Sequence, residues 1–303
     1  MSSIPPLGLP GQVFTAVQQP AKISARSKLA DRTYGMQLDC PEIARQIRPG
    51  QFFMLRSPDR SDPLLGRPFA LLDVYDDPAT GQPQGIEFGY VTVGKFTNLL
   101  STLPVGTELE IWGPLGNGFP LPDAGHWAII AGGIGQTPFV ACLREVLGFR
   151  DFGRPVVTRP RKISFCYGAR TQSALAGVDW FRMRGVDVEL ATDDGSVGLH
   201  GYVTELLKRL LTSDDPPTNV FCCGPEPMMH AVQKLTVAHN TPAWLSLETP
   251  MACGFGACFS CVARIRQDDG TWDYRRTCVE GPVFPADRVV FETACAPTGC
   301  GTT

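Results

Sequence analysis

Four cysteines in the last fifth of the chain constrain its fold more than any other feature. Cys253, Cys258 and Cys261 follow the spacing C-x4-C-x2-C, and Cys278 comes after a longer gap. This spacing is typical of the ligands of a plant-type 2Fe-2S cluster, in which each iron takes two thiolates. A tight loop supplies three ligands and a second segment supplies the fourth. We therefore expect these four cysteines to hold an iron–sulfur cluster.

The segment between Cys261 and Cys278 has the pattern of a β-hairpin. Val262–Gln267 and Trp272–Thr277 are predicted strands around Asp269-Gly270, a dipeptide that favours a two-residue turn. In a two-residue hairpin, the residue numbers of every opposed pair add up to the same value, which is 539 for a turn at Asp269-Gly270. The numbers of Cys261 and Cys278 also add up to 539, so these two cysteines are expected to face each other. The same register opposes Arg266 to Asp273 and, unfavourably, Arg264 to Arg275.

Two alternatives to an iron–sulfur cluster remain open, namely a disulfide and a structural zinc site in a non-redox interaction module. Zinc sites usually combine two C-x2-C pairs, whereas this chain has only one such pair. Gly254 and Gly256 favour the cluster, because glycine lets a loop turn closely and aim N–H groups at the sulfurs.

Composition indicates a globular protein of two domains or more. The chain has 303 residues, of which 43% are hydrophobic and 19% charged, and its net charge is -3. Without a basic stripe, nucleic acid is not expected as a partner. The beginning of the chain lacks a basic segment followed by an apolar run, and no window approaches a membrane span, so we expect a cytoplasmic protein with a disordered leader over residues 1–11.

Seven further cysteines lie outside the quartet. Cys40, Cys142, Cys166 and Cys222 have apolar neighbours and are expected to be buried small side chains. Two more, Cys295 and Cys300, lie in a tail over residues 294–303 to which the sequence assigns no role.

Residues 12–123 have the pattern of a β-barrel domain. Short alternating runs, among them Val13–Val17 and Phe69–Val74, are separated by turn residues. A short helix is predicted to begin near Thr97, which would cap it and offer free N–H groups to an anion. Arg67, which precedes Pro68 at the start of a predicted strand, suits a pyrophosphate as a bidentate partner.

Residues 124–244 change to a repeated strand, turn and helix pattern, which predicts a parallel sheet with crossover helices. The apolar strand Trp127–Ala131 is followed by the turn GGIGQTP and a helix over Phe139–Leu147. Thr137 as the cap and Pro138 in the first turn would form a helix start that can hold phosphate.

Two later strands of this part are followed by loops whose residues could bind a ligand. These loops are Thr192–Ser196, sequence TDDGS, and Cys223–Met228, sequence CGPEPM. Ligands of doubly wound sheets bind at the carboxyl ends of the strands, so the three loops predict a dinucleotide crevice.

The order of these pieces resembles the ferredoxin-NADP reductase superfamily. The motifs that carry the resemblance are RPFA, GGIGQTP and CGP, in that order along the chain. The cysteine segment MACGFGACFSCVAR, with the later CVEGPVF, is similar to the electron-transfer subunits of dihydroorotate dehydrogenase B. The resemblance implies a β-barrel flavin domain, an α/β parallel-sheet nucleotide-binding domain and a small C-terminal 2Fe-2S subdomain over residues 245–293.

The resemblance also implies roles for individual residues. FAD contacts fall on Arg67, Pro68, Phe69, Ala70, Gly89, Tyr90, Val91, Phe96 and Thr97. The pyridine nucleotide site falls on Gly132, Gly133, Gly135, Thr137, Asp194, Gly224 and Pro225. Cys223 would lie near the nicotinamide as the catalytic residue. Two positions depart from the family pattern, since Ala70 stands where a serine is usual and Phe96 where a glycine is usual.

The implied function is conversion between two-electron and one-electron transfer, because nicotinamide exchanges electron pairs, flavin exchanges either, and a two-iron cluster carries one electron. The flavin is expected to meet the nicotinamide between two domains, with the cluster on its other side near the surface. The implied partner is an FMN-containing dihydroorotate dehydrogenase subunit, with electrons flowing to NAD in pyrimidine biosynthesis. Alternatives are related subunits, namely a ferredoxin:NADP oxidoreductase alpha subunit, a sulfhydrogenase gamma subunit or an anaerobic sulfite reductase subunit.

The acidic loop around Asp193 and Asp194 favours NADH over NADPH, because it contains no Arg or Lys to meet an extra phosphate.

Overall fold

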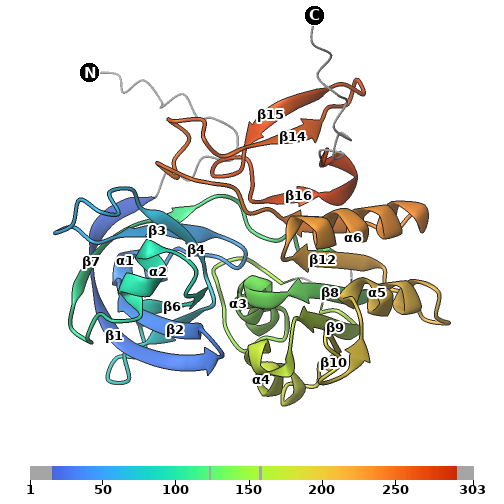
Figure 1. Ribbon diagram of the computed structural model, residues 1–303, viewed down its shortest axis with the longest axis horizontal. Helices are drawn as coiled ribbons and strands as arrows, with labels where there is room; N and C mark the ends of the chain where they lie inside the picture. The colour runs from blue at the N-terminus through green and yellow to red at the C-terminus, as the bar shows by residue number, and fades with distance from the viewer. Residues whose placement is uncertain (1–15, 123, 157–158, 292–303) are drawn as a thin grey trace, which may run out of the picture.

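Two seven-stranded sheets and a two-stranded hairpin make up the protein (Figure 1). The structure is a computed structural model and describes residues 16–122, 124–156 and 159–291. The predicted leader, Cys295, Cys300 and all but the last two residues of the predicted strand Val13–Val17 lie outside these ranges.

The first sheet is antiparallel and has the order β4-β3-β7-β1-β2-β6-β5. Its strands are β1 (Val17–Ala30), β2 (Thr33–Asp39), β3 (Phe52–Arg56), β4 (Arg67–Ala70), β5 (Asp73–Asp76), β6 (Pro83–Val91) and β7 (Glu108–Leu115). It curls around a core that includes Phe53, Phe69 and Phe88, and carries the short helices α1 (Pro41–Ala44) and α2 (Lys95–Leu100) (Figure 1).

The single strand predicted over Phe69–Val74 is wrong. The chain leaves the sheet at Leu71 and Leu72, so that β4 and β5 become the two end strands of the sheet. Leu71 N–H donates to Gln51 O and Leu72 N–H to Glu87 O, at 3.2 and 2.9 Å. Both leucines are apolar, and no turn residue marks the point where β4 ends and β5 begins. The sequence pattern therefore predicted one continuous strand.

The second sheet has the order β11-β10-β9-β8-β12-β13-β16, and all its neighbours are parallel except β13 and β16. Its strands are β8 (His126–Gly132), β9 (Lys162–Ala169), β10 (Asp187–Thr192), β11 (Leu199–His200), β12 (Asn219–Cys223), β13 (Ala243–Ser246) and β16 (Val283–Pro285). Its helices are α3 (Thr137–Val146), α4 (Val178–Arg182), α5 (Val203–Leu211) and α6 (Glu226–Ala238), with 3-10 turns η1 (Gly133–Gln136), η2 (Gln172–Ala174) and η3 (Ala286–Arg288). The predicted switch from alternating strands to a parallel sheet is confirmed.

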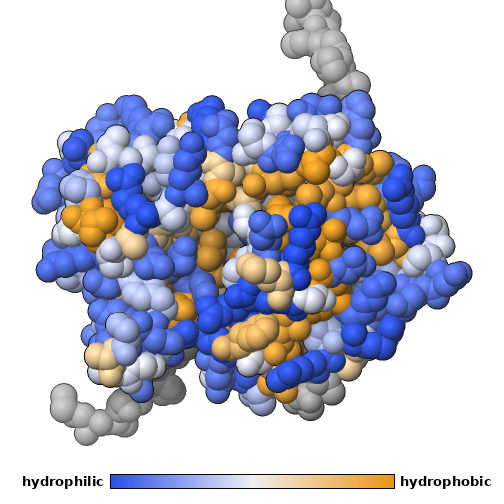
Figure 2. Space-filling view, turned by 90° about the horizontal axis from the view of Figure 1, so that it is seen from below, coloured by the Kyte–Doolittle hydropathy of each residue, from blue (hydrophilic) through white to orange (hydrophobic). Residues whose placement is uncertain are grey.

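The C-terminal cysteine segment is joined to both sheets. Its hairpin, β14 (Val262–Arg266) and β15 (Trp272–Arg276), stands above α6 in Figure 1, and β16 then pairs with β13 at the edge of the second sheet. Seen from below, apolar side chains gather over the half of the molecule that holds the second sheet, with hydrophilic ones around them (Figure 2). None of the helices in the described ranges is long and apolar enough to cross a bilayer.

The predictions for the remaining cysteines outside the quartet are confirmed where the structure describes them. Cys40, Cys142, Cys166 and Cys222 are all fully buried within the cores. Burial raises the pKa of the Cys40 and Cys142 thiols to about 12. Burial thus favours the neutral thiol form, which suits small side chains packed in a core.

Candidate active site

The four cysteines gather where the hairpin meets the first sheet. Cys253 and Cys258 lie in the loop before β14, Cys261 directly precedes β14, and Cys278 follows β15. The Sγ atoms of Cys261 and Cys278 are 3.1 Å apart, and both residues are buried. Cys253 is half-buried and Cys258 is exposed. The group therefore has two buried cysteines, one half-buried cysteine and one that faces solvent.

The hairpin is confirmed, but its predicted register is wrong by one residue. The observed pairs include Arg264 with Tyr274 and Ile265 with Asp273, which give a sum of 538. The turn has three residues, because Gln267 N–H donates to Thr271 O at 2.8 Å and Gly270 takes a φ of 84°. A three-residue hairpin loop with a left-handed glycine explains the shift. The unfavourable pairing of Arg264 with Arg275 does not occur.

Local hydrogen bonds favour the thiolate form of two cysteines. Ser260 Oγ lies 3.1 Å from Cys258 Sγ, and this contact is the main cause that lowers the pKa of Cys258 to about 6. The hydrogen bond with Cys278 lowers the pKa of Cys261 to about 6 and raises that of Cys278, because the pair shares one proton. Thiolates are the form that binds metal.

This donor set fits a two-iron cluster. Cys253 contributes to the lowered pKa of Cys258, so these two are neighbours, and Cys261 and Cys278 form a second pair. Each iron of a two-iron cluster takes two thiolates, which is what each of these two pairs offers.

The two glycines of the loop take the conformations that the sequence suggested. Gly254 has a φ of 79° and Gly256 one of 91°, values that other residues rarely adopt. A Cβ on Gly254 would lie 2.5 Å from Met54 Cγ in β3, so the loop can approach the first sheet this closely only with glycine. The backbone of Gly256 forms a hydrogen bond with Cys278.

Two residues that sequence reasoning missed fasten the cysteine segment to the first sheet. Trp112 in β7 donates its indole N–H to the Cys253 carbonyl at 2.8 Å. Asn117, just after β7, donates its side-chain amide to the carbonyls of Glu280 and Val283 at 3.2 and 2.8 Å and accepts from Val283 N–H at 3.0 Å. These bonds span 141 residues or more, so no local sequence signal could reveal them.

The residues predicted to contact FAD lie together on β4, β6 and α2. Arg67 is exposed, and among the described residues its guanidinium donates to the nearby carbonyls of Leu65 and Gly66, both at 3.0 Å. The rings of Phe69, Tyr90 and Phe96 are buried in the core instead, with the Phe69 and Phe96 ring centroids 6.2 Å apart. These three rings therefore pack within the core of the first sheet.

The predicted start of the short helix at Thr97 is wrong. α2 begins at Lys95, with Gly94 before it, and Thr97 is its third residue. The Thr97 hydroxyl accepts N–H bonds from Val93 and Gly94 at 3.0 and 3.1 Å, so the threonine secures the helix start from within. The same hydroxyl also donates to Gly94 O at 3.2 Å, so all three of these hydrogen bonds are made at the start of this helix.

The three loops predicted to form a dinucleotide crevice follow the carboxyl ends of β8, β12 and β10; β8 and β12 are neighbours in the sheet, and β9 lies between β8 and β10. A Cβ on Gly132 would lie 2.7 Å from Met228 Sδ, and one on Gly135 would collide with the Cys223 carbonyl, so the Gly-rich turn packs tightly against the CGP loop. Gly133, with a φ of 56°, faces open space. The Gln136 side chain is buried, and its Oε1 has no hydrogen-bond partner among the residues that the structure describes. An unpaired buried acceptor beside an open glycine fits a polar ligand.

The helix that follows this turn begins two residues earlier than predicted. α3 starts at Thr137, with Gln136 as the cap, and the Thr137 hydroxyl donates to Ile134 O at 2.9 Å. Asp194 lies in the loop after β10, where its carboxylate accepts bonds from the Ser196 N–H and hydroxyl at 3.0 and 2.6 Å. These bonds lower the pKa of Asp194, so its charge persists at neutral pH.

Cys223 lies at the end of β12 and is buried. Burial raises the pKa of its thiol far above the ordinary value. Burial therefore favours the neutral thiol at neutral pH.

The two predicted cofactor regions touch each other. A Cβ on Gly89 in β6 would lie 2.7 Å from Thr137 Cγ2 at the start of α3. Two further ties are the ion pairs of Arg144 with Asp73 and of Arg150 with Asp76, which join the end of α3 and the segment after it to β5. The Gly-rich turn is therefore held against the strand that carries predicted flavin contacts.

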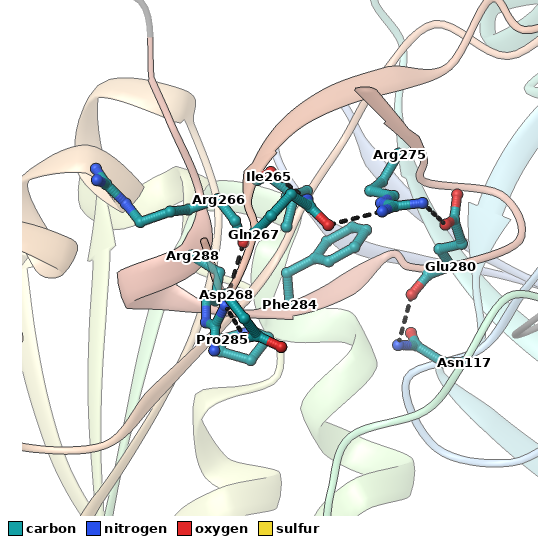
Figure 3. Close-up of a pocket in the computed structure, with 10 residues that line it drawn as sticks. All are labelled: Asn117, Ile265, Arg266, Gln267, Asp268, Arg275, Glu280, Phe284, Pro285 and Arg288. Carbon is teal, nitrogen blue, oxygen red and sulfur yellow. Dashed lines mark hydrogen bonds and ion pairs between the residues drawn. The ribbon is translucent and has the colours of Figure 1, made fainter. Parts of the chain in front are cut away.

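A separate cavity of about 510 Å³ lies under the hairpin (Figure 3). Its walls carry charged groups that already have partners, since Arg275 donates to Glu280 Oε1 at 3.2 Å and Arg288 pairs with Asp268 at 2.7 Å. It contains none of the residues predicted to bind a cofactor.

Comparison with known proteins agrees with this layout. A family model for the oxidoreductase NAD-binding domain matches residues 129–234. A second, for the iron-sulfur cluster binding domain of dihydroorotate dehydrogenase B, matches residues 248–290. The structure of an NADH-dependent reduced ferredoxin-NADP oxidoreductase superimposes with a TM-score of 0.74 at 25% identity and covers 89% of each chain. A ferredoxin reductase of carbazole 1,9a-dioxygenase shares the fold, with a TM-score of 0.60 at 20% identity over 75% of this chain and 67% of that one. The fold and the site define an NAD-linked iron–sulfur flavoprotein, an oxidoreductase subunit with a ferredoxin-NADP reductase fold.

Sequence relatives identify the family more closely. The dihydroorotate dehydrogenase B (NAD(+)) electron transfer subunit of Desulforamulus reducens is 36% identical over 274 residues, covering 90% of this chain and 98% of the relative. The corresponding subunit of Clostridium acetobutylicum is 37% identical over 246 residues, covering 81% and 87%. The chain belongs to the family of dihydroorotate dehydrogenase B electron transfer subunits.

Proposed function

We propose that the chain passes electrons between NAD and a partner FMN-containing dihydroorotate dehydrogenase subunit in pyrimidine biosynthesis. The observation that carries the proposal is the convergence of three predicted regions. Gly89 of the flavin strands touches Thr137 of the nucleotide turn, and Trp112 of the same sheet bonds to Cys253 of the cysteine loop. The relatives that support the partner are named as electron transfer subunits of dihydroorotate dehydrogenase B.

FAD would be held by the first sheet, as a flavin barrel over residues 12–123. Arg67 is exposed at the start of β4, and in the described part of the chain its guanidinium bonds to the carbonyls of Leu65 and Gly66, so it could turn to a pyrophosphate. Backbone groups of Pro68, Ala70, Gly89 and Val91 would orient the ring system. The Phe96 ring lies in the core, so it does not occupy the space of a ligand.

NAD would be held by the second sheet, over residues 124–244. Gly132, Gly133 and Gly135 let the backbone approach the ligand, and Gly224 and Pro225 form the facing loop. Asp194 keeps a charged carboxylate in the loop after β10, which disfavours a 2′-phosphate. We therefore expect NADH to be preferred over NADPH, and a lower KM for NADPH in steady-state assays would contradict this.

The four cysteines would hold the 2Fe-2S cluster, over residues 245–293. Cys253 and Cys258 would bind one iron, and Cys261 and Cys278 the other. When bound, the flavin exchanges electron pairs with nicotinamide and single electrons with the cluster. The protein buries Cys261 and Cys278 away from solvent and leaves Cys258 at the surface, where a partner can approach.

The test is co-purification of the chain with the catalytic subunit from the same genome, followed by anaerobic assay of dihydroorotate-dependent NAD+ reduction. The complex should reduce NAD+, and each subunit alone should not. A chain that copurifies with another partner and shows no dihydroorotate-dependent activity would contradict the proposal.

A second candidate function is electron transfer between NAD and ferredoxin as a subunit of a ferredoxin-linked complex. The structural match to the NADH-dependent reduced ferredoxin-NADP oxidoreductase covers 89% of this chain and supports it. Reduced ferredoxin would then bleach the flavin in the absence of any dihydroorotate dehydrogenase subunit, which the first candidate does not predict.

A further inference from the structure

Helix α3 is shared between the two sheets and lies between them in Figure 1. Residues three or four positions apart lie on the same face of a helix. Phe139 and Leu143 follow this spacing and pack into the core of the second sheet. Thr137, Ala141 and Arg144 follow it on another face. We call these three residues the inner stripe of α3, because Ala141 packs into the core of the first sheet.

The inner stripe contacts the first sheet from the first turn of α3 to its last. The Thr137 methyl group lies over Gly89 in β6, where an added Cβ would leave only 2.7 Å between the two carbons. Ala141 is fully buried. Arg144 forms an ion pair with Asp73 at the start of β5. The helix therefore rests on the strand that carries predicted flavin contacts and on the strand beside it.

Arg144 compensates two carboxylates rather than one. Asp73 lies directly opposite Glu87 in the pairing of β5 with β6, and like charges at opposed positions repel each other. Gln37 donates to Glu87 at 3.3 Å. Burial is the main cause that raises the pKa of Asp73 and of Glu87, and the Arg144 guanidinium acts against burial at both, with Arg150 acting on Asp73 as well. Loss of Arg144 would therefore weaken both the tie of α3 to β5 and the pairing of β5 with β6.

The segment after α3 adds a second tie to β5. The Arg150 guanidinium donates to Asp76 Oδ2 and to Val74 O, both at 3.0 Å. The Arg150 backbone N–H donates to the Arg144 carbonyl at 3.1 Å, so the two ties are joined through the end of the helix. Phe152 then packs into the core of the first sheet. A shift of α3 on the first sheet would have to break these contacts together.

The start of α3 carries the Gly-rich turn that is predicted to hold the nucleotide. Gly133, which faces open space, lies four residues before Thr137, and Thr137 contacts Gly89 of the flavin strand. A shift of the helix would therefore move the turn relative to that strand. Reacting atoms must come within about 3–3.5 Å of each other, and a misplacement of about 1 Å can cost about a hundredfold in rate.

We propose that the inner stripe of α3 aligns NADH with the flavin, and that Arg144 is a positioning residue that holds this alignment through Asp73. The inference rests on the proposed function, since it needs FAD on the first sheet and NAD on the second, and it adds the element that sets their relation. The step that needs the alignment is transfer of a hydride from NADH to oxidised flavin, which leaves NAD+ and the anionic reduced flavin.

The experiment follows anaerobic reduction of the flavin in the whole chain at several NADH concentrations, which gives the limiting rate and the dissociation constant separately. Hydrogen exchange of the oxidised chain without NADH measures the opening of residues 133–140. Arg144→Gln removes the ion pair, and Arg144→Lys keeps the charge. Arg161→Gln is the matched control, because Arg161 pairs with Asp215 at 2.6 Å within the part of the chain that forms the second sheet. Iron, sulfide and flavin contents confirm that each variant is intact.

We expect Arg144→Gln to lower the limiting rate at least about tenfold, while the dissociation constant of NADH changes by less than about twofold. Residues 133–140 should exchange faster in this variant. Arg144→Lys should recover most of the rate, and Arg161→Gln should match the unaltered chain in both measurements. Asp76→Asn weakens the second tie at a more exposed carboxylate and should speed exchange of the same residues about threefold.

An unchanged limiting rate in Arg144→Gln, or a loss that falls wholly on the dissociation constant, would overturn the proposal. If Arg144→Gln does not fold, unchanged exchange in Asp76→Asn would overturn it. Flavin of the unaltered chain that NADH does not reduce would contradict the proposed function instead. Reduction of this flavin requires no partner subunit, so the result is independent of which partner the chain serves.

Discussion

Trp112 offers a direct test of how the cysteine loop is held on the first sheet. Its indole N–H donates to the Cys253 carbonyl at 2.8 Å, and its ring contacts Gly66, next to Arg67. Trp112→Phe removes the donor and keeps most of the ring. A neutral hydrogen bond contributes about 1 kcal/mol, and Cys253 is only half-buried, so water can partly replace the donor. About 1 kcal/mol corresponds to about a fivefold larger population of the open loop.

The assay for this prediction is the rate at which a chelator removes iron from the oxidised protein, which reports local opening of the loop. We expect Trp112→Phe to release iron about fivefold faster and to retain its flavin. Trp180→Phe is the matched control. Trp180 lies in α4, beside the second sheet; it is also half-buried, and its ring stacks on the Arg184 guanidinium. Release at the unaltered rate in Trp112→Phe, or faster release in the control, would refute the reasoning.

Three further predictions follow from other parts of the structure. Cys258→Ser should abolish bound iron and sulfide and spare FAD, and metal content at the level of the unaltered chain would count against the ligand assignment. Gly135→Ala should weaken NADH binding at least about tenfold, because the new Cβ would strike the Cys223 carbonyl. Gly94→Ala is the control and should bind NADH as the unaltered chain does, because Gly94 has open space around it. Equal dissociation constants for the two variants would contradict this prediction. His126 is buried between Asp215 O and Ser164 Oγ, both 2.9 Å away, and burial lowers its pKa. The unfolded chain therefore binds a proton that the folded chain does not, so the free energy of unfolding should fall as pH drops below about 6.5, by at most about 1.4 kcal/mol per unit, with a flatter profile in His126→Gln.

The sequence predicted best what depends on local chemistry. The cysteine spacing, the buried cysteines and the strand, turn and helix repeats of the second sheet depend on nearby residues. The hairpin shows the limit of such reasoning. Asp269-Gly270 suggested a two-residue turn, but Asp268 joins the turn and Gly270 takes the left-handed position, which moves every pair by one. Turn length is decided by backbone twist, which the dipeptide alone does not reveal.

Long-range contacts could not be predicted from the sequence. Trp112 and Asn117 look like ordinary residues of a strand and a loop, and they matter because of partners more than 140 residues away. The crossing at Leu71 and Leu72 was hidden for a related reason. Both residues are apolar, and only the positions of β3 and β6 determine where the chain leaves one strand and begins the next.

The measurement that tests the central claim most directly is an anaerobic absorption titration of the purified chain with NADH, with iron, sulfide and flavin contents from the same sample. The proposed function predicts that flavin and iron–sulfur bands bleach together. A colourless protein that contains zinc without iron or sulfide would contradict it.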